Sequence, residues 1–371
     1  MKINLNAPIN KTSYGYVSFN ILKQLVKQGH DVALFPIGPL EIDKQEDAII
    51  IKECIEKSKT TFDSNSPCLR IYHQNKMAES IGNGKRYGMP IFELDTFTDE
   101  ERHHLSSLDH IIVNSQWAKT VIEEDFEEAG QDDARRQIPI SVAPLGVDNQ
   151  VFNYKPQLQK PTVFLNTAKW EIRKAHDIII KAFNTAFTQD DDVELWMCNH
   201  NLFIDFTQQG GEDKNKEWEQ YYTGSALGSK VRLIPRQQTH EDIAKLMNMA
   251  DCGVFPSRAE GFNLPALEMM ACGKDVIATN YSAHTEFCTD DNSLLIDIDD
   301  VEPAYDGVWF HGQGNWAVFG DKQFEQLVEH MQFIHRSKPS GALHTNEPGM
   351  ETAQQFSWEN SVGKIVEILE G

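Results

Sequence analysis

Residues 257–287, SRAEGFNLPALEMMACGKDVIATNYSAHTEF, carry the pattern that decides the fold. An apolar run, DCGVFPS, leads into this stretch and predicts a strand followed by a loop. Pro265 predicts the start of a helix, because proline is favoured at the first helical position. Gly273 suits the end of that helix, and the next apolar run, DVIAT, predicts a second strand. A strand–loop–helix–strand unit of this kind is typical of a parallel α/β sheet.

Two glutamates bracket the predicted turn, Glu260 in the loop and Glu268 in the helix. The start of a helix presents free backbone N–H groups and a positive dipole end, which suit an anionic diphosphate. Carboxylates do not bind phosphate, but they accept hydrogen bonds from sugar hydroxyls on either side of it. The pattern therefore indicates a nucleotide-sugar site. The alternative is an ordinary turn with two solvated glutamates.

The longer segment PSRAEGFNLPALEMMACGKDVIAT (256–279) resembles the E-x7-E region of the retaining glycosyltransferases of family 4, the group 1 glycosyl transferases. This resemblance implies an α/β protein of GT-B fold, with two Rossmann-like domains facing a cleft. It implies that Glu268 binds the ribose hydroxyls of the nucleotide and that Glu260 binds the hydroxyls of the donor sugar. Four further residues complete the implied donor site: Gly261, Phe262, Asn263 and Leu264.

The segment NTAKWEIRKAHDIIIKAF (166–183) resembles the first βα unit of the family's C-terminal domain. By this resemblance Lys169 takes the position of an arginine and Lys174 that of a lysine, and both hold the diphosphate as charge grows on the leaving group. A lysine at 169 replaces a bidentate fork by a point charge, and Ala175 replaces the usual glycine. Arg173 is expected to face solvent or a carboxylate. The alternative is a basic surface patch, which the helix dipole disfavours at a helix start.

The N-terminal half offers fewer candidates. His73 follows an apolar run, where family members often carry a histidine near the reacting sugar, although a structural histidine is the alternative. Gly15 is placed in the loop after the first strand, where it would let the backbone approach a phosphate or simply form a turn. Glu93 and Asp95 could bind acceptor hydroxyls or cap the helix that begins near Thr98.

The chain of 371 residues is long enough for two domains, each with its own core. Apolar runs alternate with helical patterns in both halves, and a polar segment with two prolines (147–161) is predicted to link them. We expect an acceptor-side Rossmann-like domain at 1–150, a nucleotide-sugar domain at 151–352, and a helix at 353–371 packing back toward the first domain. The predicted strands span 2–8, 31–37, 68–74, 110–115, 139–145, 162–170, 193–198, 230–235, 252–257 and 275–279. The predicted helices span 17–28, 99–107, 116–128, 176–187 and the C-terminal segment, and 199–230 is expected to be a surface insertion.

The formal net charge of −22 excludes some classes of partner. Binding to duplex DNA or to anionic lipid needs clusters of Lys and Arg, and the sequence has none of useful length. No apolar run reaches the length of a membrane span, and the N-terminus does not read as a signal peptide. Six dispersed cysteines predict reduced thiols and a cytoplasmic protein. The expected partners are a nucleotide sugar and a glycan or other hydroxyl acceptor, with no nucleic acid and no integral membrane association.

No metal or cofactor is expected beyond the UDP- or GDP-linked donor. Asp297 and Asp299 form a D-x-D pattern, but they lie in an acidic run and are expected to be solvated. Trp309 and Trp316, in the stretch DGVWFHGQGNWAVFG, are expected to anchor a loop rather than to stack on sugars. The sequence therefore predicts a retaining, metal-independent glycosyltransferase. The alternatives are a nucleotide-sugar epimerase or phosphorylase on the same fold, or a non-catalytic GT-B protein that binds glycans or regulates a partner.

Overall fold

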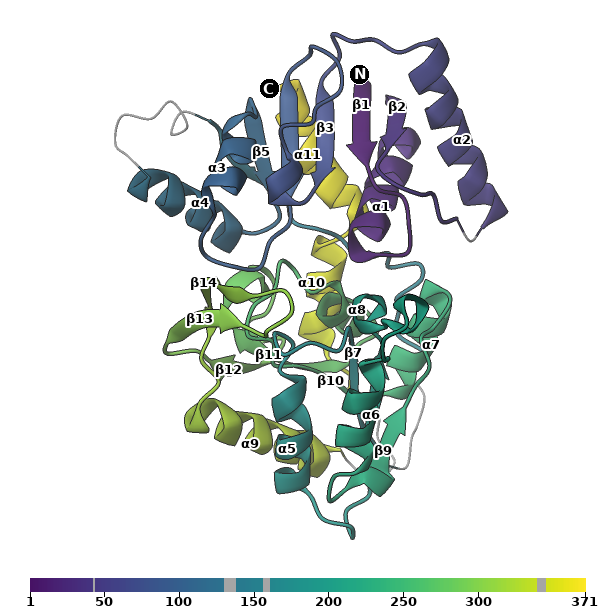
Figure 1. The fold of residues 1–371 in the computed structure, drawn as a ribbon. Coiled ribbons are helices and arrows are strands. Elements are labelled where there is room, and N and C mark those ends of the chain that lie inside the picture. The colour runs from purple at the N-terminus through teal and green to yellow at the C-terminus, as the bar shows by residue number, and fades with distance from the viewer. Residues whose placement is uncertain (43, 130–137, 156–160, 339–344) are drawn as a thin grey trace. The chain divides into compact units, whose positions relative to one another are not determined.

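The computed structural model describes residues 1–371 except 43, 130–137, 156–160 and 339–344, so part of the predicted linker lies outside the described residues. The chain divides into two compact units, residues 1–146 with 356–371 (unit 1) and residues 147–355 (unit 2). Each unit contains a six-stranded sheet flanked by helices (Figure 1). The predicted class, two Rossmann-like α/β domains, is confirmed.

Unit 1 is built on a parallel sheet of order β2-β1-β3-β4-β5-β6. Its strands are β1 (Lys2–Ala7), β2 (Asp31–Pro36), β3 (Cys68–Tyr72), β4 (Arg86–Pro90), β5 (His110–Val113) and β6 (Ile140–Val142). Its helices are α1 (Ser13–Lys27), α2 (Gln45–Thr60), η1 (Gln74–Lys76), α3 (Asp99–Ser106), α4 (Gln116–Glu128) and α11 (Trp358–Glu370). Five of the six residues of β1 are buried, as expected for a parallel strand covered by helices on both faces.

Two helices of unit 1 differ from the prediction. Helix α1 begins at Ser13, four residues earlier than expected, and α2 was not predicted at all. Only Ile51 and Cys54 of α2 are buried, so its apolar face is too narrow to give a clear periodic signal. The C-terminal helix α11 packs on α1, where the rings of Tyr16 and Trp358 lie 6.1 Å apart.

Unit 2 is built on a parallel sheet of order β12-β11-β10-β7-β8-β9. Its strands are β7 (Thr162–Ala168), β8 (Val193–Asn199), β9 (Val231–Leu233), β10 (Cys252–Phe255), β11 (Asp275–Asn280) and β12 (Leu294–Asp297). Its α-helices are α5 (His176–Ala186), α6 (Asn215–Thr223), α7 (His240–Met249), α8 (Leu264–Ala271), α9 (Asp321–Ser337) and α10 (Glu347–Gln355). Its short 3-10 helices are η3 (Leu202–Ile204), η4 (Thr207–Gln209), η5 (Gly228–Lys230) and η6 (Ser282–Glu286). Helix α8 ends just before Gly273, whose φ of 68° lies in the left-handed region that a C-terminal glycine serves.

Unit 2 departs from the expectation in several places. The elements β12, α7, α9 and α10 were not predicted, and two further regions differ. The predicted surface insertion contains α6, which packs against the domain: Trp218 stacks on Trp170 at 5.8 Å, and the Tyr222 hydroxyl donates to the His176 carbonyl at 2.8 Å. The expectation of a plain insertion was therefore wrong. An antiparallel hairpin, β13 (Val301–Tyr305) and β14 (His311–Ala317), also follows the sheet, where only a loop was expected.

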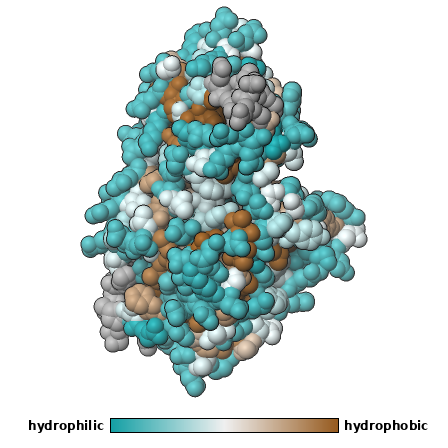
Figure 2. Space-filling model, turned by 90° about the vertical axis from the view of Figure 1, so that its left-hand side faces the viewer, coloured by the Kyte–Doolittle hydropathy of each residue, from teal (hydrophilic) through white to brown (hydrophobic). Residues whose placement is uncertain are grey.

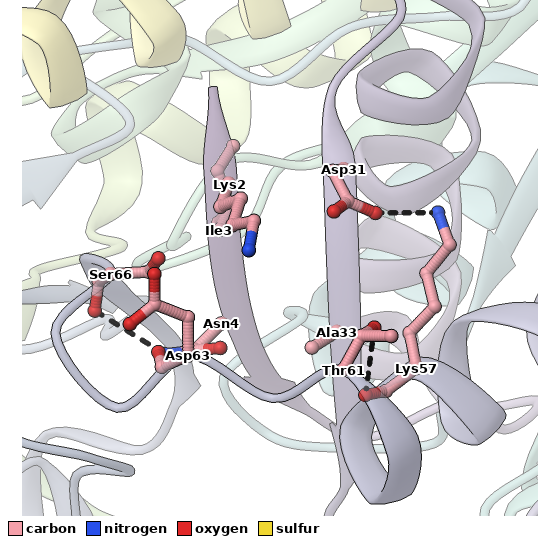
Figure 3. Close-up of a pocket in the computed structure, with 9 residues that line it drawn as sticks. All are labelled: Lys2, Ile3, Asn4, Asp31, Ala33, Lys57, Thr61, Asp63 and Ser66. Atoms are coloured by element: carbon pink, nitrogen blue, oxygen red, sulfur yellow. Dashed lines mark hydrogen bonds and ion pairs between the residues drawn. The ribbon is translucent and has the colours of Figure 1, made fainter.

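The face seen in Figure 2 is largely hydrophilic, with hydrophobic patches between the hydrophilic residues. None of the helices in the described ranges is both long and apolar enough to cross a bilayer. A shallow hollow lies beside β1 and β2 in unit 1 (Figure 3). In it the Lys57 amine pairs with an Asp31 carboxylate oxygen at 2.7 Å, and both side chains are partly exposed. We therefore assign this hollow no function.

Candidate functional site

The predicted donor-site residues of unit 2 lie near the carboxyl ends of its central strands. Strands β7 and β10 are parallel neighbours, so the loops that follow them leave the sheet on the same side. The loop after β7 holds Lys169 and Lys174, and the loop after β10 holds Glu260. The two loops also join directly, because the backbone N–H of Arg258 donates to the carbonyl of Arg173 at 2.7 Å.

Lys174 and Glu260 form a tight ion pair. The Lys174 amine lies 2.5 Å and 2.7 Å from the two carboxylate oxygens of Glu260, and the Ser257 hydroxyl donates to the same carboxylate at 2.6 Å. Burial alone would raise the pKa of Glu260, but the charges of Lys174 and Arg173 outweigh it and lower this pKa to about 2. Burial lowers the pKa of Lys174, and Glu260 opposes that shift. Glu260 is therefore a carboxylate at neutral pH, with a cation beside it.

Arg173 is also part of the site. Its side chain is buried, and its guanidinium donates to the Ala259 carbonyl at 2.7 Å, to Glu260 at 3.2 Å and to Glu171 at 3.0 Å. Arg173 was expected to face either solvent or a carboxylate. It faces two carboxylates and is not turned to solvent.

Glu171 completes a chain of alternating charges. This buried carboxylate also accepts from the Lys169 amine at 2.9 Å. Burial raises the pKa of Glu171, but the charges of Arg173 and Lys169 outweigh it and the net shift is downward. This row of charged side chains contains three cations and two anions, in the order Lys169, Glu171, Arg173, Glu260 and Lys174. The site therefore carries one net positive charge within a chain of net charge −22.

Ala175 shows why the family position usually holds glycine. It is buried, precedes α5, and has φ 57° and ψ 31°, a left-handed conformation. A residue with a Cβ atom adopts it at a cost of roughly 1–2 kcal/mol. The conformation is supported by Arg258, which forms a bidentate pair with Asp177 in the first turn of α5 at 3.0 Å and 2.9 Å and donates to the Ile172 carbonyl at 2.5 Å.

Glu268 lies in α8 in a different environment from Glu260. Its side chain is buried, and among the described residues no hydrogen bond or ion pair of its carboxyl group is recorded. Burial raises the pKa of Glu268 to about 8. A buried carboxyl group without a partner is costly, so this group is available to a ligand that supplies hydroxyl donors.

The loop before α8 is held by His284, a residue of η6, the short helix that follows β11. Asn263 has φ 74°, and its amide nitrogen lies 2.7 Å from Nε2 of His284. Nδ1 of His284 lies 3.0 Å from the Thr279 carbonyl, which can only accept, so the proton sits on Nδ1 and Nε2 accepts from Asn263. Burial lowers the pKa of His284 to about 4, which keeps the ring neutral. Residues 261–264 are thus fixed at the start of α8, as the predicted phosphate contact requires.

In unit 1 the structure places His73 directly after β3, with an exposed side chain whose ring centroid lies 4.6 Å from that of Tyr14. Gly15 was expected in a loop, but it lies in the first turn of α1. A Cβ atom there would meet the backbone oxygen and nitrogen of Asn10 at 2.2 Å and 2.4 Å. Close packing against Asn10 is therefore sufficient reason for this glycine.

Contacts in the structure bear on the remaining candidates, the residues near Thr98 and the D-x-D pair. Thr98 itself caps α3, through a capping box with Glu101, so of the two alternatives for Glu93 and Asp95 the capping role is excluded. Asp299 pairs with Lys322 at 2.8 Å on the surface. Within the described ranges, no group of three or more His, Cys, Asp or Glu residues is placed to hold a metal ion.

Several residues of the site carried no signal that identified them in the sequence. Ser257, Ser282 and His284 all lie within the opening stretch, but no role was predicted for them. The Ser282 hydroxyl accepts from the backbone N–H of Glu260 at 2.9 Å. Short polar side chains such as these are common in any loop, and only the fold brings them to the carboxylate.

Comparison with known proteins shows one family match over part of the chain. Residues 149–308 match the family model described as glycosyl transferases group 1, and this region contains all the residues predicted to bind the donor except Gly15. The predicted resemblance to GT-B, group 1 glycosyltransferases is therefore confirmed.

Curated relatives match parts of the chain. A D-inositol 3-phosphate glycosyltransferase of Paenarthrobacter aurescens is 29% identical over 239 residues, which are 62% of this chain and 50% of the relative. An uncharacterised glycosyltransferase of Methanocaldococcus jannaschii is 28% identical over 143 residues, 38% of this chain and 34% of the relative. The matched regions thus span half or less of the length of these relatives.

Solved structures match the fold along the whole chain. Anabaena HepE in complex with UDP and glucose has a TM-score of 0.68 at 17% identity, with 100% of this chain and 99% of that chain covered. The sucrose-phosphate synthase of Thermosynechococcus elongatus has a TM-score of 0.66 at 16% identity, with 100% and 98% covered. At these identities the likeness establishes the GT-B fold.

Proposed function

We propose that this protein is a retaining glycosyltransferase that moves a sugar from a nucleoside diphosphate sugar to a hydroxyl group of a glycan acceptor. The observation that carries the proposal lies near the carboxyl ends of the central strands of unit 2, where an ionised Glu260 lies against Lys174. Glu268 lies one helix turn beyond the loop as a buried carboxyl group with no recorded partner. The group 1 family match and the names of the curated relatives support the same activity.

Each charged group has a role in this proposal. Lys174 and Lys169 hold the diphosphate, together with the backbone amides at the start of α8. Glu260 accepts hydrogen bonds from the donor sugar, and Glu268 accepts them from the ribose. Arg173 remains bound to Glu260 when Lys174 turns toward phosphate, so the carboxylate keeps a cation beside it. The leaving phosphate oxygen takes the acceptor proton, as the resemblance to retaining enzymes implies.

The donor is tested first. A thermal-shift panel of UDP, GDP, ADP and their sugars identifies the base, because a ligand that binds the folded state raises the unfolding temperature. UDP-linked sugars head the panel, since the solved complex of the structurally similar HepE contains UDP. Transfer is then assayed with the donor that binds.

We place the protein in a reducing compartment such as the cytoplasm, in keeping with six free cysteines.

Two alternatives make different predictions. A nucleotide-sugar epimerase forms product from the donor alone, without an acceptor. A non-catalytic GT-B protein binds nucleotide or glycan but releases no nucleoside diphosphate from the donor. The buried pair of Lys174 and Glu260 favours an enzyme over a non-catalytic protein, because a buried ion pair is not needed for stability alone. The requirement for an acceptor separates transfer from epimerisation.

Glu268→Ala is expected to weaken nucleotide binding by roughly 1.5–3 kcal/mol, the range for hydrogen bonds to a charged group. The pKa of Glu268, near 8, adds a second readout. The free carboxyl group is mostly protonated at pH 7, whereas accepting two ribose hydroxyls favours the carboxylate, so binding should release close to one proton. Calorimetry in buffers of different ionisation enthalpy measures this release. Glu268→Gln should abolish it, and an unchanged release would contradict the assignment.

Transfer is expected to proceed without Mg²⁺ or Mn²⁺, because lysines and a helix start are placed to neutralise the leaving diphosphate. The test is the transfer rate after dialysis and in excess EDTA. Activity that EDTA abolishes and Mn²⁺ restores would refute metal independence. It would also return Asp297 and Asp299 to consideration.

A further inference from the structure

Exposed aromatic side chains gather in unit 2 beside the loop that holds the lysines. The side chains of Phe203 and Trp309 are 51% and 47% exposed, and their ring centroids lie 5.9 Å apart at an interplanar angle of 84°. The Lys169 amine lies 5.3 Å from the centre of the Phe203 ring. These three residues form one surface, here called the aromatic shelf.

The Trp309 side of the shelf is rigid. Trp309 lies at the turn of the β13–β14 hairpin, where one carboxylate oxygen of Asp306 accepts from three successive backbone N–H groups. These belong to Val308, Trp309 and Phe310, at 2.8, 2.7 and 2.9 Å. Such a turn holds its conformation without a ligand.

The Phe203 side is tied to the lysine loop. Asn201 is fully buried, and its side-chain oxygen accepts from the backbone N–H of Phe203 at 3.0 Å. The amide nitrogen of Asn201 donates to the Trp170 carbonyl, also at 3.0 Å. Phe203 is thereby fixed relative to Lys169, one residue before Trp170.

The base of the hairpin is tied to the same loop. Trp316 is buried, and the Arg258 guanidinium lies 5.8 Å from its ring centre while donating to the Ile172 carbonyl. Trp316 is thus buried, as expected of a residue that anchors the loop, whereas Trp309 packs edge-on against Phe203 and stays 47% exposed. Trp309 therefore leaves part of its ring surface in solvent, on a hairpin whose base is anchored.

The exposure of Trp309 and Phe203 indicates a ligand. Covering exposed apolar ring surface with a ligand is favourable, and a rigid aromatic platform binds with little loss of conformational entropy. Apolar surface bordered by polar groups marks binding sites.

We infer that the aromatic shelf binds a pyranose ring of the acceptor glycan, an inference that rests on the proposed function. A pyranose has an apolar C–H face that packs on an aromatic ring, and equatorial hydroxyls that reach a neighbouring amine. Asp205 and Asp306 flank the two aromatic segments in sequence, which disfavours an anionic ligand and suits a neutral sugar. Lys169 belongs both to the shelf and to the proposed diphosphate site, so the bound ring lies next to the donor.

The test uses Trp309→Ala and Phe203→Ala in the full chain, with Phe333→Ala as the matched control. Phe333 is also 51% exposed in unit 2, but it lies on α9. The probes are maltotriose, cellotriose, mannotriose and chitotriose, titrated calorimetrically in the presence of saturating UDP. We expect the trisaccharide that binds the native protein best to bind both shelf variants at least tenfold more weakly. Phe333→Ala should bind it normally, and all three variants should retain native UDP affinity.

Three outcomes overturn the inference. They are native trisaccharide binding in both shelf variants, failure of the native protein to bind any of the four, and a loss of UDP affinity in Trp309→Ala, which would make the shelf a nucleobase platform. Failure of the proposed function looks different. The native protein would then neither bind a nucleoside diphosphate nor transfer a sugar, whatever the shelf variants do with trisaccharides.

Discussion

Lys174→Ala is expected to lower turnover by about 10²–10³-fold, the usual loss when one preorganised donor to a developing anion is removed. The Lys174 side chain is only 14% exposed, so its charge acts in a medium that screens it far less than water. The diphosphate gains negative charge as the anomeric bond breaks. Lys174 therefore stabilises the transition state more than the bound donor, and the loss should appear in turnover more than in KM.

Lys169→Ala serves as the comparison. The Lys169 side chain is 46% exposed and its amine is bound to Glu171, so solvent weakens its hold on phosphate. Its removal should cost much less turnover than that of Lys174. Steady-state kinetics of both variants, with thermal unfolding to confirm that they are folded, separate the two lysines. Turnover of Lys174→Ala within threefold of the native value would overturn the assignment of the leaving-group cation to Lys174.

The donor loops were predictable because their signals are local. Proline at a helix start, glycine at a helix end and apolar strands on both sides specify the unit around Glu260 and Glu268. The direction of Arg173 was not predictable, because neighbouring loop residues have no fixed relative orientation. Only the pairing of β7 with β10 brings this arginine to Glu260 and makes it part of the site.

The elements that were missed depend on contacts distant in sequence. Helix α6 is polar. It is held on the domain by the stacking of Trp218 on Trp170 and by a hydrogen bond from the Tyr222 hydroxyl to the His176 carbonyl. A periodic pattern cannot reveal such contacts. The expected position of Gly15 in a loop was wrong for a related reason. Gly15 is required by the closeness of Asn10, whereas Ala175 adopts the left-handed conformation that a glycine would favour.

Glu260→Gln is the second change with a large expected effect, and it should act in opposite directions on two measurements. Turnover should fall by roughly 10- to 150-fold, because the donor sugar loses a hydrogen bond to a carboxylate, worth roughly 1.5–3 kcal/mol. Affinity for the bare nucleoside diphosphate should rise. The substitution raises the net charge of the five-residue chain from +1 to +2, and Lys174 no longer has a carboxylate competing with phosphate for its amine.

Glu171→Gln is the matched control for this result. It adds the same positive charge two residues from Lys169, but Glu171 contacts the two cations and is not proposed to contact the sugar. Glu171→Gln should therefore also tighten nucleotide binding while retaining much more turnover than Glu260→Gln. Titration with the nucleoside diphosphate and the transfer rate, measured on both variants, give the comparison. If Glu260→Gln instead weakens nucleotide binding in proportion to its loss of turnover, Glu260 serves the nucleotide rather than the sugar, and the proposed division between the two glutamates is wrong.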